Sequence, residues 1–159
     1  MQMKLQKSAF EDLSSTIPGV DFSDLNATAL MVVDVQHSDA TPGRGWVKAC
    51  EAVAPLPDET IIRKTTQGAF NGSEIHNTLE RMGIKNLVFT GVVTSCCVET
   101  TARDAADRGF GYVLVSDGCA DADPGMHNAA MLNFGLYFGK VVQSAEELTG
   151  PLMAAVTSS

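Results

Sequence analysis

Apolar runs alternate with amphipathic segments along this 159-residue chain. Runs rich in branched and aromatic residues predict buried strands at 28–36, 59–64, 86–93 and 112–117, with a short last strand at 140–144. Helical spacing and cap residues predict helices at 46–54, 73–83, 96–109, 123–139 and 145–156. Strands that alternate with helices in this way are typical of a parallel sheet covered by helices on both faces.

The length of the chain suits one domain, and we predict an irregular lead-in over residues 1–27 and a single domain over 28–159. A net charge of -8 argues against binding to nucleic acid, whose phosphates an acidic surface repels. No segment has the apolar length of a membrane span or signal peptide, so we expect a cytoplasmic protein without a membrane partner. The cysteines lack zinc-site spacing and are expected to be thiols: Cys50, Cys96, Cys97 and Cys119.

Three residues with chemical potential lie at or just past the ends of predicted strands, namely Asp34, Lys64 and Cys97. Because functional groups gather at the carboxyl ends of parallel strands, these side chains could converge at one edge of the sheet. A cysteine that opens a helix is favoured as thiolate, Asp34 could take its proton, and Lys64 could balance the charge. Cys96, one residue earlier, is expected to point into the core. From spacing alone, each residue more often has a structural role: an Asp after a strand as a helix cap or loop residue, a Lys after a strand as a solvated side chain, and a Cys at a helix start as a buried one.

The turn between the strand at 86–93 and the following helix also carries possible donors. A thiolate that attacks a carbonyl creates an oxyanion, which needs preorganised N–H groups. The segment VVTSC can supply them, and we expect the amides of Val93 and Cys97 to form this oxyanion hole.

Three ordered segments resemble the isochorismatase-like cysteine hydrolases: MVVDVQ, IIRKTTQGAF and LVFTGVVTSCCVETTARDAADRGFGYVLVSDGCA. The similarity continues through MHNAAMLNFGLYFGKVVQSAEEL and covers residues 28–148. The resemblance implies a three-layer α/β/α sandwich with a mostly parallel sheet and a triad of Asp34, Lys64 and Cys97. It also implies a cis peptide at Val92–Val93, no cofactor, and a homodimer or homotetramer.

Within that family, the sequence looks most like the amidohydrolases of ureido and carbamoyl compounds, such as ureidoacrylate and biuret hydrolases. The implied reaction is hydrolysis of a C–N bond in a small-molecule amide through a Cys97 thioester, with Asp34 as base and acid and Lys64 as orienting cation. Nicotinamidases carry an Asp-x-His metal motif after the second strand, and this motif is not found here. We therefore expect no metal site, and we expect His76 and His127 to be residues of helix surfaces.

The sequence departs from the family between Asp34 and Lys64, which are 30 positions apart (64 minus 34). One helix–strand unit after the first strand is missing, either because a segment is omitted or because the protein is a shortened variant completed by another chain. The missing unit affects the predicted substrate pocket more than the triad, because pockets of this family draw residues from that region. Local side chains that could bind a ureido group or wall the pocket are Gln36, Trp46, Gln67, Phe70 and Asn71.

Two other functions remain open at this point. A vinyl ether hydrolase of the isochorismatase type would need acid chemistry and no nucleophile. A non-catalytic family member would serve as a binding or scaffold protein, with an unreactive Cys97. Arg103 and Asp104, which follow the cysteine on the predicted helix, are expected to be structural and to pair with neighbouring loops.

Overall fold

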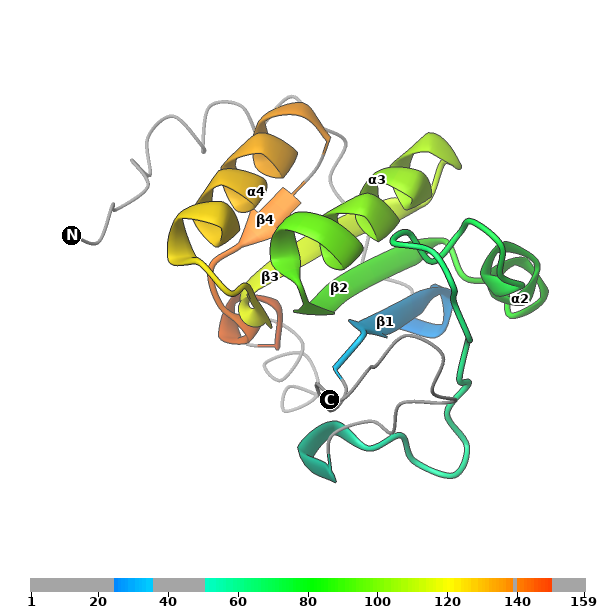
Figure 1. Ribbon diagram of the computed structural model, residues 1–159. Helices are drawn as coiled ribbons and strands as arrows, with labels where there is room; N and C mark the ends of the chain where they lie inside the picture. Colours follow the sequence, from blue (N-terminus) through cyan, green and yellow to red (C-terminus); the bar gives the residue numbers. More distant parts are fainter. Residues whose placement is uncertain (1–24, 36–50, 139, 150–159) are drawn as a thin grey trace, which may run out of the picture.

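A computed structural model describes residues 25–35, 51–138 and 140–149. Within these residues, four strands form one sheet whose neighbours are all parallel, in the order in which they occur along the chain (Figure 1). The strands are β1 (Thr28–Val33), β2 (Asn86–Val92), β3 (Gly111–Ala120) and β4 (Lys140–Val142). The parallel α/β class predicted from the sequence is confirmed.

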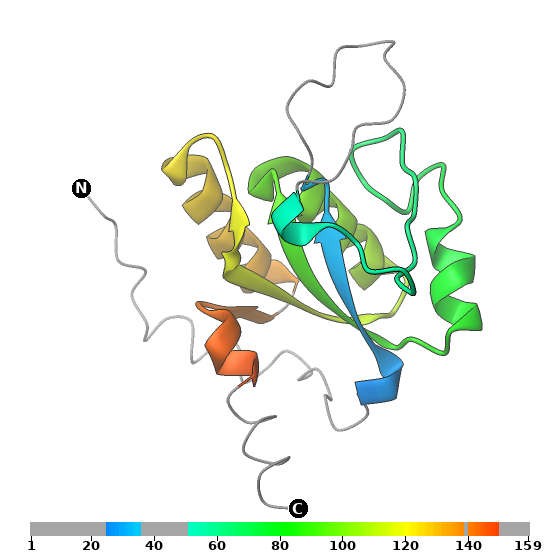
Figure 2. The same ribbon diagram turned by 90° about the horizontal axis from the view of Figure 1, so that it is seen from below.

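Helices connect these strands, and the two longest lie together on one face of the sheet, as Figures 1 and 2 both show. The longer helices are α2 (Ile75–Arg81), α3 (Glu99–Asp107) and α4 (Pro124–Tyr137). The short helical turns are η1 (Leu25–Ala27), η2 (Glu51–Val53) and η3 (Thr94–Val98), and a further helix begins at residues 145–149. No helix of this described part is long and apolar enough to cross a membrane.

The main core lies between the sheet and the pair α3 and α4. Alternate residues of each strand point to this face, as the two-residue period of a strand requires. Phe89 and Leu114 from the sheet and Val98, Met131 and Phe134 from the helical side share one cluster, and each is at most 1% exposed. This burial fixes η3, which contains Val98, against the carboxyl end of the sheet.

The opposite face of the sheet is covered unevenly. Val113 and Val142 are buried in a second cluster against which Leu148 packs. Leu30 and Val32 of β1, on the same face, are 62% and 49% exposed. The prediction that the first strand is buried on both faces is therefore wrong for β1, because the described helices cover this face only near β3 and β4.

Strand β1 also pairs on one side only within the described residues, where its neighbour is β2. An edge position fits the predicted lack of a helix–strand unit after the first strand. In Figure 2, β1 lies at the border of the sheet, beside the segment that leads from η2 toward α2.

The predicted strand at 59–64 is wrong. This segment has no regular secondary structure and no sheet partner in the described part of the chain, and Ile61 is 70% exposed. Two neighbouring isoleucines give local β-propensity, but a strand forms only where another strand can pair with it. The predicted helix at 46–54 is described only from residue 51, where it is the single turn η2.

Candidate active site

Asp34 and Lys64 meet at the carboxyl end of β1. Asp34 directly follows the strand and has a φ of 52°, a left-handed conformation that an aspartate tolerates better than most residues. Its carboxylate forms an ion pair with the Lys64 ammonium, and the two side chains are only 23% and 14% exposed. Lys64 Nζ also donates to the backbone carbonyls of Thr66, at 3.0 Å, and Gln67, at 3.3 Å. Lys64 lies in a loop and not in a strand, and these contacts hold its ammonium in place.

Cys97 is held in η3, the helical turn between β2 and α3. Burial, and after it the neighbouring Asp34 carboxylate, raise the pKa of the Cys97 thiol to about 11, and the Lys64 charge only partly offsets them. The expectation that a helix start would favour the thiolate is therefore wrong for the resting site. Cys97 precedes α3, and its partial burial beside a carboxylate outweighs the positive end of the helix.

Backbone hydrogen bonds to a single carbonyl hold the turn η3 together. The Val93 carbonyl accepts hydrogen bonds from the amides of Cys96, at 3.1 Å, and Val98, at 3.3 Å. The peptide between Val92 and Val93 is cis, as the resemblance implied. The turn that contains the proposed oxyanion donors is thus a compact unit at the end of β2.

Thr101 joins this turn to the loop that follows Lys64. Its hydroxyl donates to the Cys97 carbonyl at 2.6 Å and accepts from the Ala69 amide at 3.1 Å. Thr101 is completely buried. The hydrogen bonds of one side chain therefore fix the lysine loop relative to the cysteine.

Gln67 is brought to the cysteines. Its Oε1 lies 3.3 Å from the sulfur of Cys96 and 3.3 Å from that of Cys97, and both thiols can donate to it. The expectation that Cys96 points into the core is wrong. Because the two cysteines lie in a π-helical turn and not at the start of a regular α-helix, their side chains both reach the same amide.

Phe70 and Asn71 do not reach the cysteines and have structural contacts instead. The Phe70 ring is 6% exposed, packs 5.8 Å from the ring of Phe110, and lies under the Arg108 guanidinium. Asn71 donates to an Asp104 carboxylate oxygen at 3.0 Å. Neither is part of the site proposed below. Two other predicted pocket residues, Gln36 and Trp46, lie outside the described residues.

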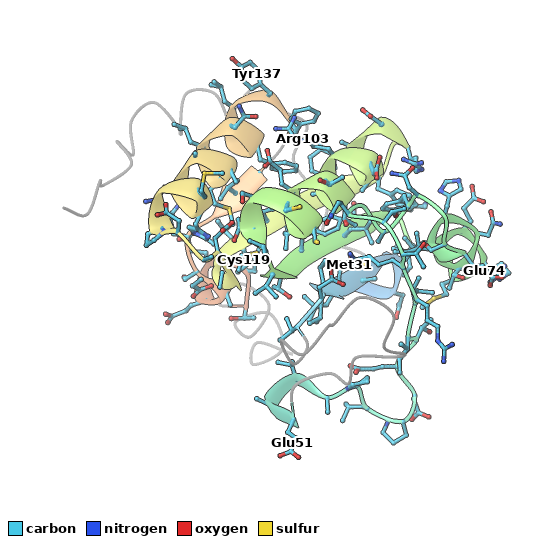
Figure 3. All side chains as sticks on the ribbon, in the orientation of Figure 1. Met31, Glu51, Glu74, Arg103, Cys119 and Tyr137 are labelled. Carbon is cyan, nitrogen blue, oxygen red and sulfur yellow. The ribbon has the colours of Figure 1, made fainter. Side chains whose placement is uncertain are left out.

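Arg103 and Asp104 have structural contacts, but only Asp104 contacts a loop, through Asn71, whereas the partners of Arg103 lie on helices. Arg103, which is labelled in Figure 3, forms an ion pair with Glu99 and hydrogen-bonds Asn133, and this joins α3 to α4. Asp104 pairs with Arg108 one turn later. Since both side chains are engaged away from Asp34, they belong to the packing of α3.

His127 was expected on a helix surface, and this is wrong. Its ring is half-buried, with Nδ1 2.9 Å from Thr94 Oγ1 and Nε2 3.2 Å from Ser116 Oγ. A signal was present in the sequence, because an Asp-Pro helix start places His127 in the first turn beside the carboxyl end of the sheet. His76, in contrast, is 40% exposed and lies 3.5 Å from Glu80.

Asp121 is a further residue that sequence reasoning missed. Its carboxylate accepts the Ser95 amide at 2.8 Å and the Ala122 amide at 2.8 Å. Desolvation alone would raise the pKa of Asp121, but hydrogen bonds from Ser95 and from the amides of Ala122 and Asp123 outweigh it and lower the pKa. Asp121 is therefore fixed as an anion next to η3.

Two other features of the described residues bear on the site. No group of three or more histidines, cysteines and acidic residues in these ranges could hold a metal ion. A cavity of about 260 Å³ lies between α3 and α4, away from the ion pair of Asp34 and Lys64. Its lining residues are Ser95, Glu99, Arg103, Met126, Ala129, Ala130 and Asn133.

Comparison with known proteins gives a family match over residues 29–146, to the isochorismatase domain. Nicotinamidase 3 of Arabidopsis thaliana is 36% identical over 104 residues, which are 65% of this chain and 52% of that protein. Ureidoacrylate amidohydrolase RutB of Stutzerimonas stutzeri (strain A1501) is 36% identical over 99 residues, 61% of this chain and 40% of that protein. The chain thus spans about half the length of these curated relatives.

Solved structures show the same fold. An isochorismatase-like hydrolase from Alkaliphilus metalliredigens superposes with a TM-score of 0.67 at 24% identity, over 77% of this chain and 70% of that one. A cysteine hydrolase from Pseudomonas syringae pv. phaseolicola 1448A has a TM-score of 0.63 at 25% identity, over 69% and 56%. The arrangement of the described strands and helices is therefore that of isochorismatase-like hydrolases.

Proposed function

Because the chain belongs to the isochorismatase family, we propose that it is a cysteine-dependent hydrolase that cleaves a C–N bond of a small ureido- or carbamoyl-type amide. One observation carries the proposal. The Asp34 carboxylate is near enough to the Cys97 thiol to raise its pKa, and the same carboxylate is paired with Lys64. A nucleophile, a base and a cation that orients the base are the parts that covalent hydrolysis requires. Similarity to the ureidoacrylate amidohydrolases supports the substrate class.

The first half-reaction begins from a protonated thiol. As the Cys97 sulfur attacks the amide carbonyl carbon, the thiol proton passes to Asp34, so that no free thiolate needs to accumulate. The resulting oxyanion receives hydrogen bonds from the amides of Val93 and Cys97. Asp34 then returns the proton to the leaving nitrogen, the C–N bond breaks, and an acyl group remains on sulfur.

The second half-reaction uses the same groups with water. Asp34 takes a proton from a water molecule as its oxygen attacks the thioester carbonyl. The C–S bond breaks, and the Cys97 sulfur regains a proton from Asp34. Lys64 keeps the carboxylate in place through both steps, since its other donors are fixed on the loop carbonyls. The reaction needs no metal and no redox cofactor for its balance.

Gln67 is the described pocket candidate that fits a role in binding. Its carboxamide oxygen already lies 3.3 Å from the nucleophilic sulfur, so its side chain borders the position that the scissile group must occupy. An amide can both donate to and accept from a ureido group. We therefore propose that Gln67 moves aside from the thiols and binds the substrate amide.

Nicotinamide is the second candidate substrate, because nicotinamidase 3 of Arabidopsis thaliana is as similar to this chain as the ureidoacrylate amidohydrolase. It requires the same attack of Cys97 on a carboxamide carbon. Vinyl ether hydrolysis and a non-catalytic binding role are the remaining alternatives. They differ in the part that Cys97 plays, so one substitution distinguishes them.

The test measures ammonia release from N-carbamoyl-β-alanine, ureidoacetate and nicotinamide by the wild type, Cys97→Ala and Cys96→Ala. The proposal expects release from a ureido acid, loss of at least ~10³-fold in Cys97→Ala, and a rate within about threefold of wild type in Cys96→Ala. Turnover that survives Cys97→Ala would contradict covalent catalysis and favour acid chemistry. No release from any amide by the wild type would favour the binding role.

A further inference from the structure

His127 is a half-buried polar side chain that the proposed chemistry does not use, although both of its ring nitrogens are engaged. Nδ1 lies 2.9 Å from the Thr94 hydroxyl of η3, and Nε2 lies 3.2 Å from the Ser116 hydroxyl of β3. A hydroxyl can donate or accept, so either neutral tautomer of the ring satisfies both contacts. The ring therefore connects the turn that carries the nucleophile to the sheet.

A second side chain holds the same turn from the same side. The Asp121 carboxylate, just past the end of β3, accepts the Ser95 amide at 2.8 Å. Hydrogen bonds to an ionised acceptor are about twice as strong as neutral ones. Two successive residues of η3, Thr94 and Ser95, are thus bound by a side chain from the first turn of α4 and by one from the segment that links β3 to α4.

The start of α4, which carries His127, is capped and hydrogen-bonded. The Asp123 carboxylate caps α4 by accepting the amides of Gly125, at 2.7 Å, and Met126, at 3.0 Å. The His127 amide donates to the Asp123 carbonyl at 3.1 Å. Pro124 occupies the start of the helix, where its fixed φ is already helical. The histidine ring consequently projects from a backbone that is capped and hydrogen-bonded.

We propose that Asp121 and His127, together called the clamp, are positioning residues that hold η3 at the distance from Asp34 that the reaction requires. The inference rests on the proposed function and adds two residues that touch neither the substrate nor the reacting sulfur. Thr94 is completely buried. Because the Val93 carbonyl binds two later amides of the turn, a shift of Thr94 carries Cys97 with it. A displacement of 1 Å at a reacting centre costs about 10²-fold in rate.

Two substitutions of His127 separate positioning from folding. In His127→Asn the side-chain amide lies where Nδ1 was and keeps the Thr94 contact, whereas in His127→Gln it lies where Nε2 was and keeps the Ser116 contact. Each variant loses one hydrogen bond, so their melting temperatures should agree closely. The clamp predicts that kcat falls about 10²-fold in His127→Gln with KM within about twofold, and that His127→Asn recovers at least about tenfold of this loss.

A measurement without substrate tests the positioning role of the clamp independently of the proposed function. Iodoacetamide labelling of Cys97 at pH 8, followed by peptide mass spectrometry, reports whether the thiol stays buried beside Asp34. If η3 shifts, the thiol loses the two causes of its raised pKa, so labelling should become at least about fivefold faster in His127→Gln and stay within about twofold in His127→Asn. Cys119, which is buried in the core, provides the internal reference.

His76→Gln is the matched control, because His76 lies on α2 and its partner is Glu80. It should leave hydrolysis and labelling unchanged. Equal kcat values or equal labelling rates in the two His127 variants would overturn the clamp. If the wild type hydrolyses nothing, the proposed function fails, and the labelling contrast still decides whether His127 positions Cys97.

Discussion

Replacing Gly91 with alanine tests how closely β1 and β2 must approach to place Asp34. Gly91 lies in β2 opposite Val33 and has a φ of +124°, which residues with side chains rarely adopt. A Cβ at this position would lie 2.1 Å from the Val33 carbonyl oxygen and 2.6 Å from the Val33 nitrogen. Both are backbone atoms of the neighbouring strand, so no side-chain rotation can relieve the contact.

The expected loss follows from these two terms. A backbone conformation reserved for glycine costs about 1–3 kcal/mol, and forcing extra atoms into a packed site costs about 1–3 kcal/mol more. The sum of about 2–6 kcal/mol is a large part of the roughly 5–15 kcal/mol that stabilises a typical domain. Because Val33 directly precedes Asp34, any strand separation also moves the carboxylate away from Cys97.

Urea unfolding of Gly91→Ala and Gly83→Ala provides the assay. Gly83 also has a positive φ, +73°, but a Cβ there would meet nothing within 4 Å. Gly83→Ala should therefore cost only the backbone term of about 1–2 kcal/mol. The reasoning predicts that Gly91→Ala loses at least about 1 kcal/mol more unfolding free energy than Gly83→Ala. Equal losses in the two variants would refute it, since the close approach of the strands would then contribute nothing.

Three further predictions concern the site. Thr101→Val should lower the unfolding free energy by about 1–3 kcal/mol, because the Ala69 amide loses its buried acceptor; a thermal melt that matches wild type would contradict this. Asp34→Asn should lower kcat by about 10²–10⁴-fold in an ammonia-release assay, and unchanged turnover would exclude Asp34 as the base. The labelling rate of Cys97 should keep rising above pH 9 toward its pKa of about 11, since a raised pKa keeps the thiol protonated at lower pH; a plateau near pH 8 would contradict the burial argument.

The sequence predicted the parallel class because the apolar runs that became β2 and β3 are each followed by a helical segment. It also predicted that Asp34 and Lys64 would meet, since both follow apolar runs that end in charge. It could not show that Lys64 is carried by a loop. The two isoleucines before it have the composition of a strand, and only the absence of a partner in the described sheet decides otherwise.

The environment of Cys97 could not be predicted from the sequence either, because it depends on contacts between distant parts of the chain. Its pKa depends on burial and on the distance to a carboxylate 63 positions earlier (97 minus 34), neither of which local pattern contains. Phe70 appeared to be a pocket wall because it lies in the lysine loop, but its ring is part of the core. His127 appeared to be a surface residue because helix periodicity cannot identify hydrogen-bond partners on other elements, here Thr94 of η3 and Ser116 of β3.

The most direct test of the account is to trap the acyl group on Cys97. Wild-type protein is mixed with N-carbamoyl-β-alanine or nicotinamide, quenched in acid within a turnover, and digested for peptide mass spectrometry. The account predicts an acyl adduct on the peptide that contains Cys96 and Cys97, retained in Cys96→Ala and absent in Cys97→Ala. Ammonia release without any adduct on this peptide, or an adduct that persists in Cys97→Ala, would contradict hydrolysis through a Cys97 thioester.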